Sequence, residues 1–418
     1  MATGPDGPGV RIEHRCSGRG RLRQALARAL VPFYPLAGRM ATGPEGRLEI
    51  DCNGEGALFV VARADFTGDE MFRDFEPSPE ARRLLVPFAA SGDPPCLLAM
   101  VQWSLIGEKD YLSSWLLRGI SASAGARMAV RDHCDLDYTT EPNLFFWLAV
   151  RECTVARTGR LTDCRPVNSQ STGEVTFLKC GGVAVGTGMH HVTMDGAGAI
   201  QFIRTWTTLA RGLDAASVHP SPPVHDRTVL RARSPPHATF EHPVYSPSNL
   251  NGLPRPFVTR VYAVSPKLLA GIKSSCAPGV STYCALTAHL WRAMCVARGL
   301  APDAESRLRV PATSGSACAR SCRPITSATP LVESEKGSQA ARGQFMPETD
   351  LWVVSWLGMP IHDADFGWGC PKFVAPAQMF GSGTAYVTQA PDKDDGVSVL
   401  FALEPEYLQC FEKAFYGE

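Results

Sequence analysis

The chain has 418 residues, 44% of them apolar, which is enough to form the cores of two domains or of one large domain. Its 41 Lys and Arg residues balance 41 Asp and Glu residues, which excludes the strong positive field typical of proteins that bind nucleic acid or anionic membranes. No apolar run reaches the length of a membrane span, about 18 residues, and the N-terminal residues 1–23 lack the apolar centre of a secretory signal. The 14 cysteines are scattered along the sequence, which fits reduced thiols. We therefore expect a cytoplasmic protein.

The first half of the chain predicts a mixture of helices and strands. Apolar residues recur at helical spacing from Leu22 to Leu30, and Pro32 ends this pattern. Short strands are expected at 47–51 and 57–61, around a Cys-Asn-Gly turn. Residues 175–189 read as two strand segments separated by a Gly-Gly break, and they place His191 at the end of a strand.

The helix that follows and the second half of the chain continue this α/β pattern. An amphipathic helix is expected from Asp195, with Gly212 as its C-cap. The proline-rich residues 220–256 predict a long crossover between two halves. Beyond them we expect a helix from Ser265 and a longer one capped by Ser281 and stopped by Gly299. The alternating apolar residues of 397–401 predict a strand, and 405–415 a closing helix.

The candidate for chemistry is His191, which is followed by Asp195 and Gly196. An unperturbed imidazole has a pKa of about 6.5, so it can take a proton from a hydroxyl or an amine at cellular pH. Such a base suits acyl transfer, in which the acceptor loses a proton as it attacks a carbonyl. The pattern alone is also compatible with a core histidine and a helix-capping aspartate, so its position at a strand–helix junction carries the argument.

A second cluster reads Asp365-Phe366-Gly367-Trp368-Gly369. Two glycines and two aromatic residues in so short a stretch indicate a tight turn packed by its rings. We expect this cluster to be structural.

Together, His191-x-x-x-Asp195-Gly196 and the turn of residues 365–369 resemble the paired signature of the BAHD acyltransferase superfamily. The stretches 29–39, 49–54, 177–182 and 230–233 look like the plant branch that transfers hydroxycinnamoyl groups from coenzyme A to shikimate or quinate. The resemblance covers about 22–102, 175–312 and 328–418.

The resemblance implies an α/β fold of two similar chloramphenicol-acetyltransferase-like domains with mixed sheets backed by helices. Their bounds here would be 1–219 and 257–418, joined by the crossover loop 220–256. Acyl-CoA, the co-substrate, would enter a channel between the domains from one face, and a small acceptor from the other. The resemblance implies a cytoplasmic monomer of plant phenylpropanoid metabolism, with no bound cofactor and no metal; it does not identify the residues that bind coenzyme A.

The resemblance also implies roles for individual residues. His191 would be the general base, and the indole N–H of Trp356 would help to hold the tetrahedral oxyanion. Asp195 would turn away from the substrate and pair with an arginine, whereas Gly196 would leave room for the pantetheine arm. Asp365, Phe366, Gly367, Trp368 and Gly369 would form a structural motif, with Asp365 braced by an arginine.

The sequence departs from the family pattern in several places. The family's opening strand is missing, and 103–174 stands as an insert that shows no sustained periodicity and is expected to be irregular. Residues 314–326 replace a segment that would supply the arginine for Asp365, and a helical segment is absent after Gln344. Val354 and Gly358 stand where shikimate-specific relatives carry threonine and arginine. The missing arginine weakens the case for shikimate or quinate as the acceptor, and a neutral polyol, an alcohol or an amine fits as well.

Several alternatives remain at this level. The insert could be a genuine lobe or intron sequence translated in frame, and in the second case the chain could be a non-catalytic or misfolded product of an aberrant gene model. A trimeric acetyltransferase of the chloramphenicol type would also use the histidine motif, although the turn of residues 365–369 and the chain length disfavour it. A zinc protein using His190, His191 and cysteines is disfavoured because paired Cys-x-x-Cys spacing is missing.

Overall fold

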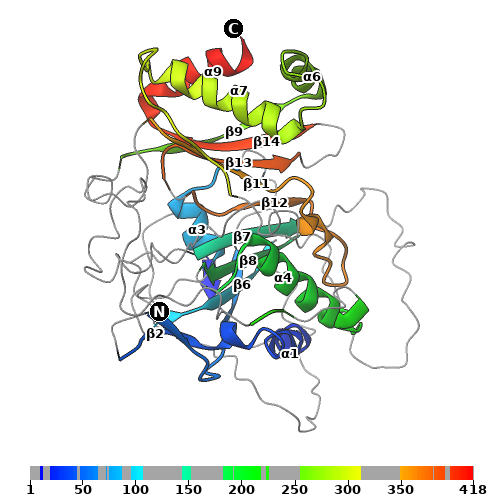
Figure 1. Cartoon of the computed structure of the whole chain (residues 1–418). Helices are drawn as coiled ribbons and strands as arrows, with labels where there is room; N and C mark the ends of the chain where they lie inside the picture. Colours follow the sequence, from blue (N-terminus) through cyan, green and yellow to red (C-terminus); the bar gives the residue numbers. More distant parts are fainter. Residues whose placement is uncertain are drawn as a thin grey trace, which may run out of the picture.

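The fold is built on two larger sheets, each with helices against it, stacked one above the other (Figure 1). In a computed structural model, the described residues are 10–12, 19–44, 48–64, 72, 75–86, 96–106, 144–151, 182–191, 193–217, 223–225, 255–311, 349–379, 381–390 and 396–417. We call the part built on the six-stranded sheet the N-terminal half and the part built on the five-stranded sheet the C-terminal half.

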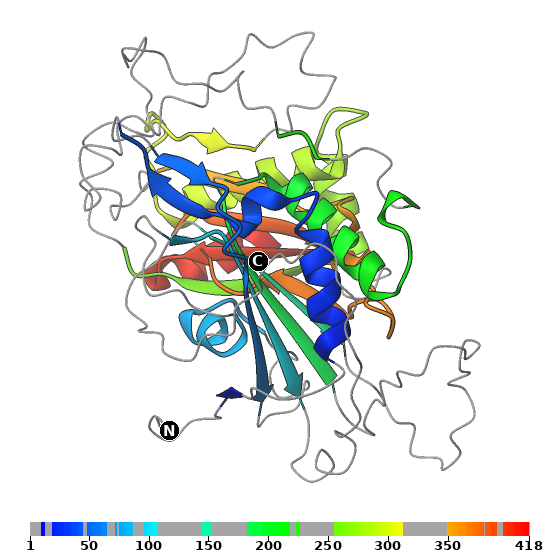
Figure 2. The ribbon, with the colours of Figure 1, turned by 90° about the horizontal axis from the view of Figure 1, so that it is seen from below.

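The six-stranded sheet forms the centre of the N-terminal half. Its strands run in the order β1 (Val10–Ile12), β4 (Leu58–Ala64), β6 (Ala99–Ile106), β8 (Gly182–His190), β7 (Leu144–Arg151) and β12 (Phe373–Pro376). The helices of this half are α1 (Arg19–Ala29), α3 (Pro79–Leu85) and α4 (Gly196–Ala210). Helices α1 and α4 lie side by side (Figure 2), and the indole of Trp206 on α4 donates a 3.0 Å hydrogen bond to the carbonyl of Leu22 on α1.

A small sheet and two short helices complete this half. The sheet runs β3 (Leu48–Asp51), β2 (Arg39–Thr42) and β5 (Cys96–Leu97), and the 3-10 helices are η1 (Tyr34–Ala37) and η2 (Ala215–Ser217). The expected N-terminal helix and the two short strands are therefore confirmed, and each boundary shifts by only a few residues.

The C-terminal half has a five-stranded sheet with three helices above it in Figure 1. The strand order is β10 (Leu308–Arg309), β11 (Leu351–Ser355), β13 (Thr384–Gln389), β14 (Val397–Leu403) and β9 (Val258–Val264). The helices are α6 (Pro266–Ser274), α7 (Thr282–Ala297) and α9 (Leu408–Tyr416), and the 3-10 helices are η6 (Pro360–Asp363) and η8 (Pro405–Tyr407). Alternation along β14 sends Val399 and Phe401 into the core beneath these helices, and Leu400 and Ala402 toward the N-terminal half.

Local sequence signals explain where the longer helices begin and end. The hydroxyls of Ser265 and Ser281 accept backbone N–H groups at the starts of α6 and α7, as expected for N-caps. Gly212 and Gly299 follow the ends of α4 and α7 with positive φ angles, which L-residues adopt at a cost.

One strand crosses between the halves. Strand β12 comes from the C-terminal part of the sequence, yet it pairs antiparallel with β7 at the edge of the six-stranded sheet. Four residues of the segment 257–418 therefore complete the sheet of the N-terminal half.

The expectation that the whole of 103–174 is irregular is wrong for two segments. Strand β6 continues into this segment as far as Ile106, and Leu144–Arg151 forms β7, which pairs with β8 over eight residues. Backbone pairing with two neighbours can order a strand even where its sequence lacks periodicity. The remainder of 103–174, most of the crossover 220–256, and the altered region 312–348 lie outside the described residues.

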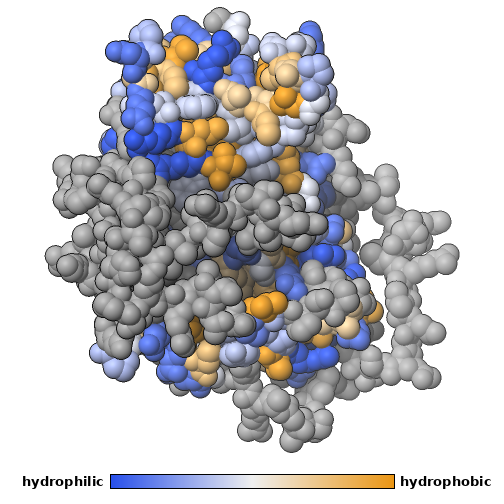
Figure 3. Space-filling view, viewed as in Figure 1, coloured by the Kyte–Doolittle hydropathy of each residue, from blue (hydrophilic) through white to orange (hydrophobic). Residues whose placement is uncertain are grey.

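The described surface has a mixed character. On the face shown in Figure 3, hydrophobic and hydrophilic residues are interspersed over the C-terminal half, as is usual for protein surfaces. In the part of the chain that the structure describes, no helix has the length and apolar character needed to cross a bilayer.

Candidate active site

His191 lies immediately after β8, in the turn that leads into α4. The preceding residue, His190, is the last of the strand and is buried, whereas His191 is exposed. The backbone N–H and the hydroxyl of Thr193 both donate to the carbonyl of His190, at 3.0 and 2.6 Å, and fix this turn. The backbone on either side of His191 is therefore held in a defined turn, and the residue is exposed.

The packing of β8 explains the glycines that precede the histidines. A Cβ atom at Gly186 would lie 1.8 Å from the carbonyl oxygen of Leu85, so only glycine allows α3 to approach the strand this closely. The strand that carries His191 is thus anchored by a helix as well as by its neighbours in the sheet.

The two adjacent histidines are both held toward the neutral form. Burial, together with the smaller effect of the neighbouring His191, lowers the pKa of His190 to about 4. Protein around His191 replaces part of its hydration and lowers its pKa below 6.5, while a backbone hydrogen bond and the negative charge of Asp195 act in the opposite direction. A neutral imidazole is the form that can accept a proton.

Asp195 forms the N-cap of α4. Its Oδ1 accepts a 2.8 Å hydrogen bond from the backbone N–H of Gly198, and its backbone is extended, as caps require. Among the described residues no arginine forms an ion pair with Asp195. The local cap therefore helps to hold the start of the helix.

Gly196 faces a segment of the C-terminal half. A Cβ atom at this position would lie 3.8 Å from Cε of Met359, an ordinary van der Waals separation. The protein itself therefore leaves space for a larger residue here. Met359 in turn donates its backbone N–H to the carbonyl of Trp356 at 3.1 Å, so a short turn connects the tryptophan with the residue that faces Gly196.

Trp356 follows β11 and is buried. Its ring meets Tyr386 of β13 edge to face, with centroids 5.0 Å apart. Its backbone N–H donates to the carbonyl of Val387 at 2.8 Å. The indole is thus fixed in position, as an oriented hydrogen-bond donor must be.

The turn of residues 365–369 is built around one carboxylate. Oδ1 of Asp365 accepts the backbone N–H groups of Gly367 and Gly369, each at 2.7 Å. Both glycines have positive φ angles, 109° and 103°, which β-carbon-bearing residues adopt with strain. The carboxylate also forms a 3.7 Å ion pair with Arg211 at the end of α4.

The aromatic residues of this turn pack across the junction between the halves. Phe366 meets Trp206 of α4 edge to face at 4.6 Å and stacks on Trp368 at 5.2 Å. The turn therefore holds the C-terminal half against α4, the helix whose N-terminus lies at His191. Sequence reasoning did not identify Arg211, Met359 or Tyr386, since these residues carry no signal until the two halves are placed together.

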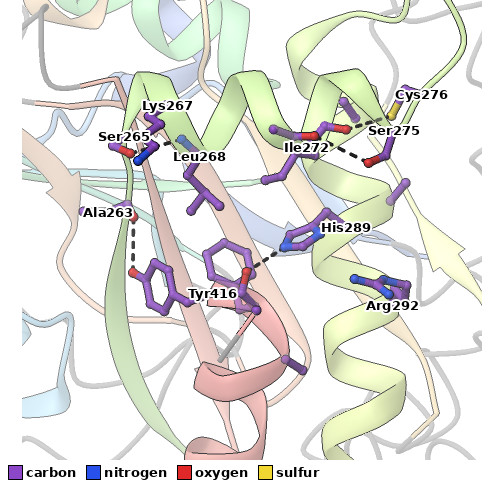
Figure 4. Close-up of a pocket in the computed structure, with 16 residues that line it drawn as sticks. Ala263, Ser265, Lys267, Leu268, Ile272, Ser275, Cys276, His289, Arg292 and Tyr416 are labelled. Atoms are coloured by element: carbon purple, nitrogen blue, oxygen red, sulfur yellow. Dashed lines mark hydrogen bonds between the residues drawn. The ribbon is translucent and has the colours of Figure 1, made fainter.

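A separate hollow lies away from these residues. A groove of about 900 Å³ runs between α6, α7 and α9 on the outer side of the C-terminal half (Figure 4). Its polar groups serve the fold: His289 is hydrogen bonded to the carbonyl of Phe415 at 2.7 Å, and the hydroxyl of Tyr416 donates to Ala263 at 3.2 Å. Because it contains none of the candidate residues, we do not assign the chemistry to it.

Metal ligation finds no support in the described residues, which contain no group of three or more His, Cys, Asp or Glu side chains that could hold a metal ion. His190 is buried at the end of β8 and its neighbour is exposed.

The fold is shared with solved structures of other proteins. A solved structure of TRI101 from F. sporotrichioides, complexed with coenzyme A and T-2, superposes with a TM-score of 0.52 at 15% identity over 96% of this chain and 92% of that one. At this identity the similarity establishes the fold alone.

Sequence comparison establishes the family. The model of the Transferase family matches residues 16–102, 172–312 and 330–417. Putrescine hydroxycinnamoyltransferase 1 of Oryza sativa subsp. japonica is 33% identical over 95% of this chain and 86% of its own length. Shikimate O-hydroxycinnamoyltransferase of Nicotiana tabacum is 29% identical over 94% and 87%. The chain belongs to this transferase family, the BAHD acyltransferases, and is an acyltransferase of the acyl-CoA-dependent class.

Proposed function

We propose that this protein transfers a hydroxycinnamoyl group from coenzyme A to an alcohol or amine acceptor, with His191 as the general base. The observation that carries the proposal is an accessible imidazole, held neutral between a strand end and a helix start, at the junction of two halves. The relatives at 33% and 29% identity are named as hydroxycinnamoyltransferases that act on an amine and on an alcohol, which supports both acceptor classes.

The chemistry follows from the placement of the groups. The imidazole of His191 accepts the proton of the acceptor O–H or N–H as the oxygen or nitrogen attacks the thioester carbonyl. The carbonyl oxygen becomes an oxyanion, which the indole N–H of Trp356 stabilises. The C–S bond then breaks, and the imidazolium returns the proton to the departing coenzyme A thiolate. No other cofactor is needed, because the proton and the leaving group balance the reaction.

The residue at position 358, two residues after Trp356, favours an acceptor other than shikimate. Gly358 stands where the shikimate-specific pattern has an arginine, and its φ angle is +73°, so an arginine here would be strained. Without an arginine at this position, a bidentate hydrogen-bonded pair with the carboxylate of shikimate cannot form here. An aliphatic amine or a neutral alcohol fits the remaining groups.

We further propose that the enzyme acts as a cytoplasmic monomer without nucleic-acid or membrane partners. Equal numbers of basic and acidic residues support the absence of nucleic-acid and anionic-membrane partners, since the chain as a whole carries no net positive charge to attract them.

The test measures release of free coenzyme A thiol from coumaroyl-CoA with a panel of amines and alcohols. Replacing His191 with Ala should lower kcat by about 10²- to 10⁴-fold, the usual contribution of a general base. His289→Gln, on the distant helix α7, is the matched control and should keep the wild-type rate. Equal rates for His191→Ala and wild type would refute the base assignment, and no release with any pair would favour a non-catalytic protein.

A further inference from the structure

A second cavity, of about 340 Å³, lies where the halves meet. One wall is the face of the five-stranded sheet that looks toward the N-terminal half, with Thr388, Ser398 and Leu400. The other wall contains β12 and the residues just before α3. Its volume falls within the range of small-molecule sites, about 300–1,000 Å³, and such sites are common between domains.

The wall formed by the N-terminal half is aromatic. Phe72, Phe75 and Phe373 surround the cavity, with ring centroids 5.2 to 5.8 Å apart in each pair. Rings at these separations offer edges and faces to a further aromatic ring. The one carboxylate among the lining residues, that of Glu76, is already paired with Arg260, and the side chain of His362 also lines the cavity.

The opposite wall carries a hydroxyl that the fold does not use. Thr388 is 5% exposed, and its Oγ1 has no hydrogen-bond partner among the described residues. It lies directly across from Ser398 in the β13–β14 ladder. A buried polar group without a partner costs free energy, so a ligand that supplies the missing bond would be favoured.

The wall that contains Thr388 lies on the same strand, β13, as Tyr386, which contacts Trp356 of the proposed catalytic centre. Tyr386, which packs against Trp356, precedes Thr388 by two residues on β13 and therefore points to the same face of the sheet. The two positions are about 7 Å apart along the strand.

We propose that this cavity binds a phenolic ring, with Thr388 as the hydrogen-bond partner of the phenol hydroxyl and the three phenylalanines around the ring. The inference rests on the proposed function, because the ring could belong either to the acyl group or to an aromatic acceptor. Thr388 would then determine specificity between substrates that differ only in one hydroxyl.

The test variant is Thr388→Val, which removes the hydroxyl but keeps the shape. Thr259→Val is the matched control, since Thr259 is a second buried threonine on the same sheet whose hydroxyl lacks a described partner and which lies outside the cavity lining. Neither variant loses a described hydrogen bond, so both should unfold at or above the wild-type temperature.

Two kinetic arms distinguish the sources of the ring. With putrescine as a fixed acceptor, kcat/KM is compared for coumaroyl-CoA and cinnamoyl-CoA; with cinnamoyl-CoA as a fixed donor, it is compared for tyramine and phenethylamine. One neutral hydrogen bond predicts a two- to tenfold preference, about the usual range, for the phenol in one arm. Thr388→Val should bring that ratio close to one, and Thr259→Val should retain it.

A binding measurement tests the proposed phenol site without requiring the enzyme to turn over a substrate. Titration calorimetry should show tighter binding of 4-ethylphenol than of ethylbenzene to the wild type and to Thr259→Val, and equal binding to Thr388→Val. A phenol preference that survives in Thr388→Val, or none in the wild type, overturns the proposal. A normal binding result without coenzyme A release would instead reject the proposed function and leave this site standing.

Discussion

At the scale of single residues, the protonation of His191 sets the expected pH dependence. Its pKa is lowered below 6.5, so the neutral base is present at pH 7 and is lost as the pH falls through the shifted value. The negative charge of Asp195 limits this shift. We therefore expect kcat/KM to fall on an acid limb whose midpoint lies below pH 6.5.

Replacing Asp195 with Asn should move this acid limb to a lower pH. The amide removes the charge that raises the pKa of His191, yet its oxygen can still cap α4 by accepting the N–H of Gly198. The measurement is a pH profile of kcat/KM together with a thermal unfolding curve. Asp195→Ala serves as the comparison, because it should also lose about 1 kcal/mol of stability with the cap; an unmoved limb in Asp195→Asn would contradict the electrostatic coupling.

A substitution at Gly196 tests whether the pantetheine arm of the acyl-CoA passes over this residue. A methyl group at this position meets only Met359 at an ordinary distance, and alanine forms helices more readily than glycine. Gly196→Ala should therefore keep or raise the unfolding temperature while raising KM for the acyl-CoA about tenfold or more. An unchanged KM for the donor, determined at saturating acceptor, would show that the pantetheine arm does not pass over Gly196.

At the scale of elements, the turn of residues 365–369 connects the halves. Asp365→Ala removes two charge-assisted hydrogen bonds and an ion pair, so we expect the free energy of unfolding to fall by about 2 kcal/mol. Arg211→Ala removes only the 3.7 Å pair, whose members are partly exposed, and should cost less than about 1 kcal/mol. Urea unfolding of both variants would check this; equal losses would mean that the ion pair, rather than the turn, carries the stability.

Elements with strong local signals could be predicted from the sequence. Serine caps, apolar periodicity and terminal glycines located α4, α6 and α7 closely. Strand β7 could not be predicted in this way, because its order comes from pairing with β8 and β12, which are distant in the sequence. The same reason hid Arg211, whose partner Asp365 lies far along the chain, whereas His191 was identifiable because its whole motif is local.

At the scale of the whole molecule, β7 lies between β8 and β12 in the six-stranded sheet, and both of these strands belong to the part of the chain that matches the family. The family match stops at 102 and resumes at 172, so this segment lies outside the matched pattern of the family. Deleting 107–171, which keeps all of β6, leaves unpaired edges on β8 and β12. We expect β12 to move by about one strand spacing, 4.8 Å, and to pair with β8.

The deletion variant should therefore be folded and should release coenzyme A at least as fast as the full chain. Hydrogen exchange of the amides in Gly182–His190 reports directly on whether the edge of β8 is covered. The undeleted chain is the control. Rapid exchange in β8, or an aggregated product, would show that β7 is an integral part of the sheet.

The crossing of β12 into the other sheet has a consequence for biosynthesis. A ribosome must polymerise the chain as far as Phe373–Pro376 before the outer edge of β7 finds its partner. Until then a nascent chain presents an open row of amide and carbonyl groups, which invites association with neighbouring polypeptides. Translation speed and chaperone supply should accordingly govern the yield of native enzyme more strongly than they would for two lobes that mature one after the other.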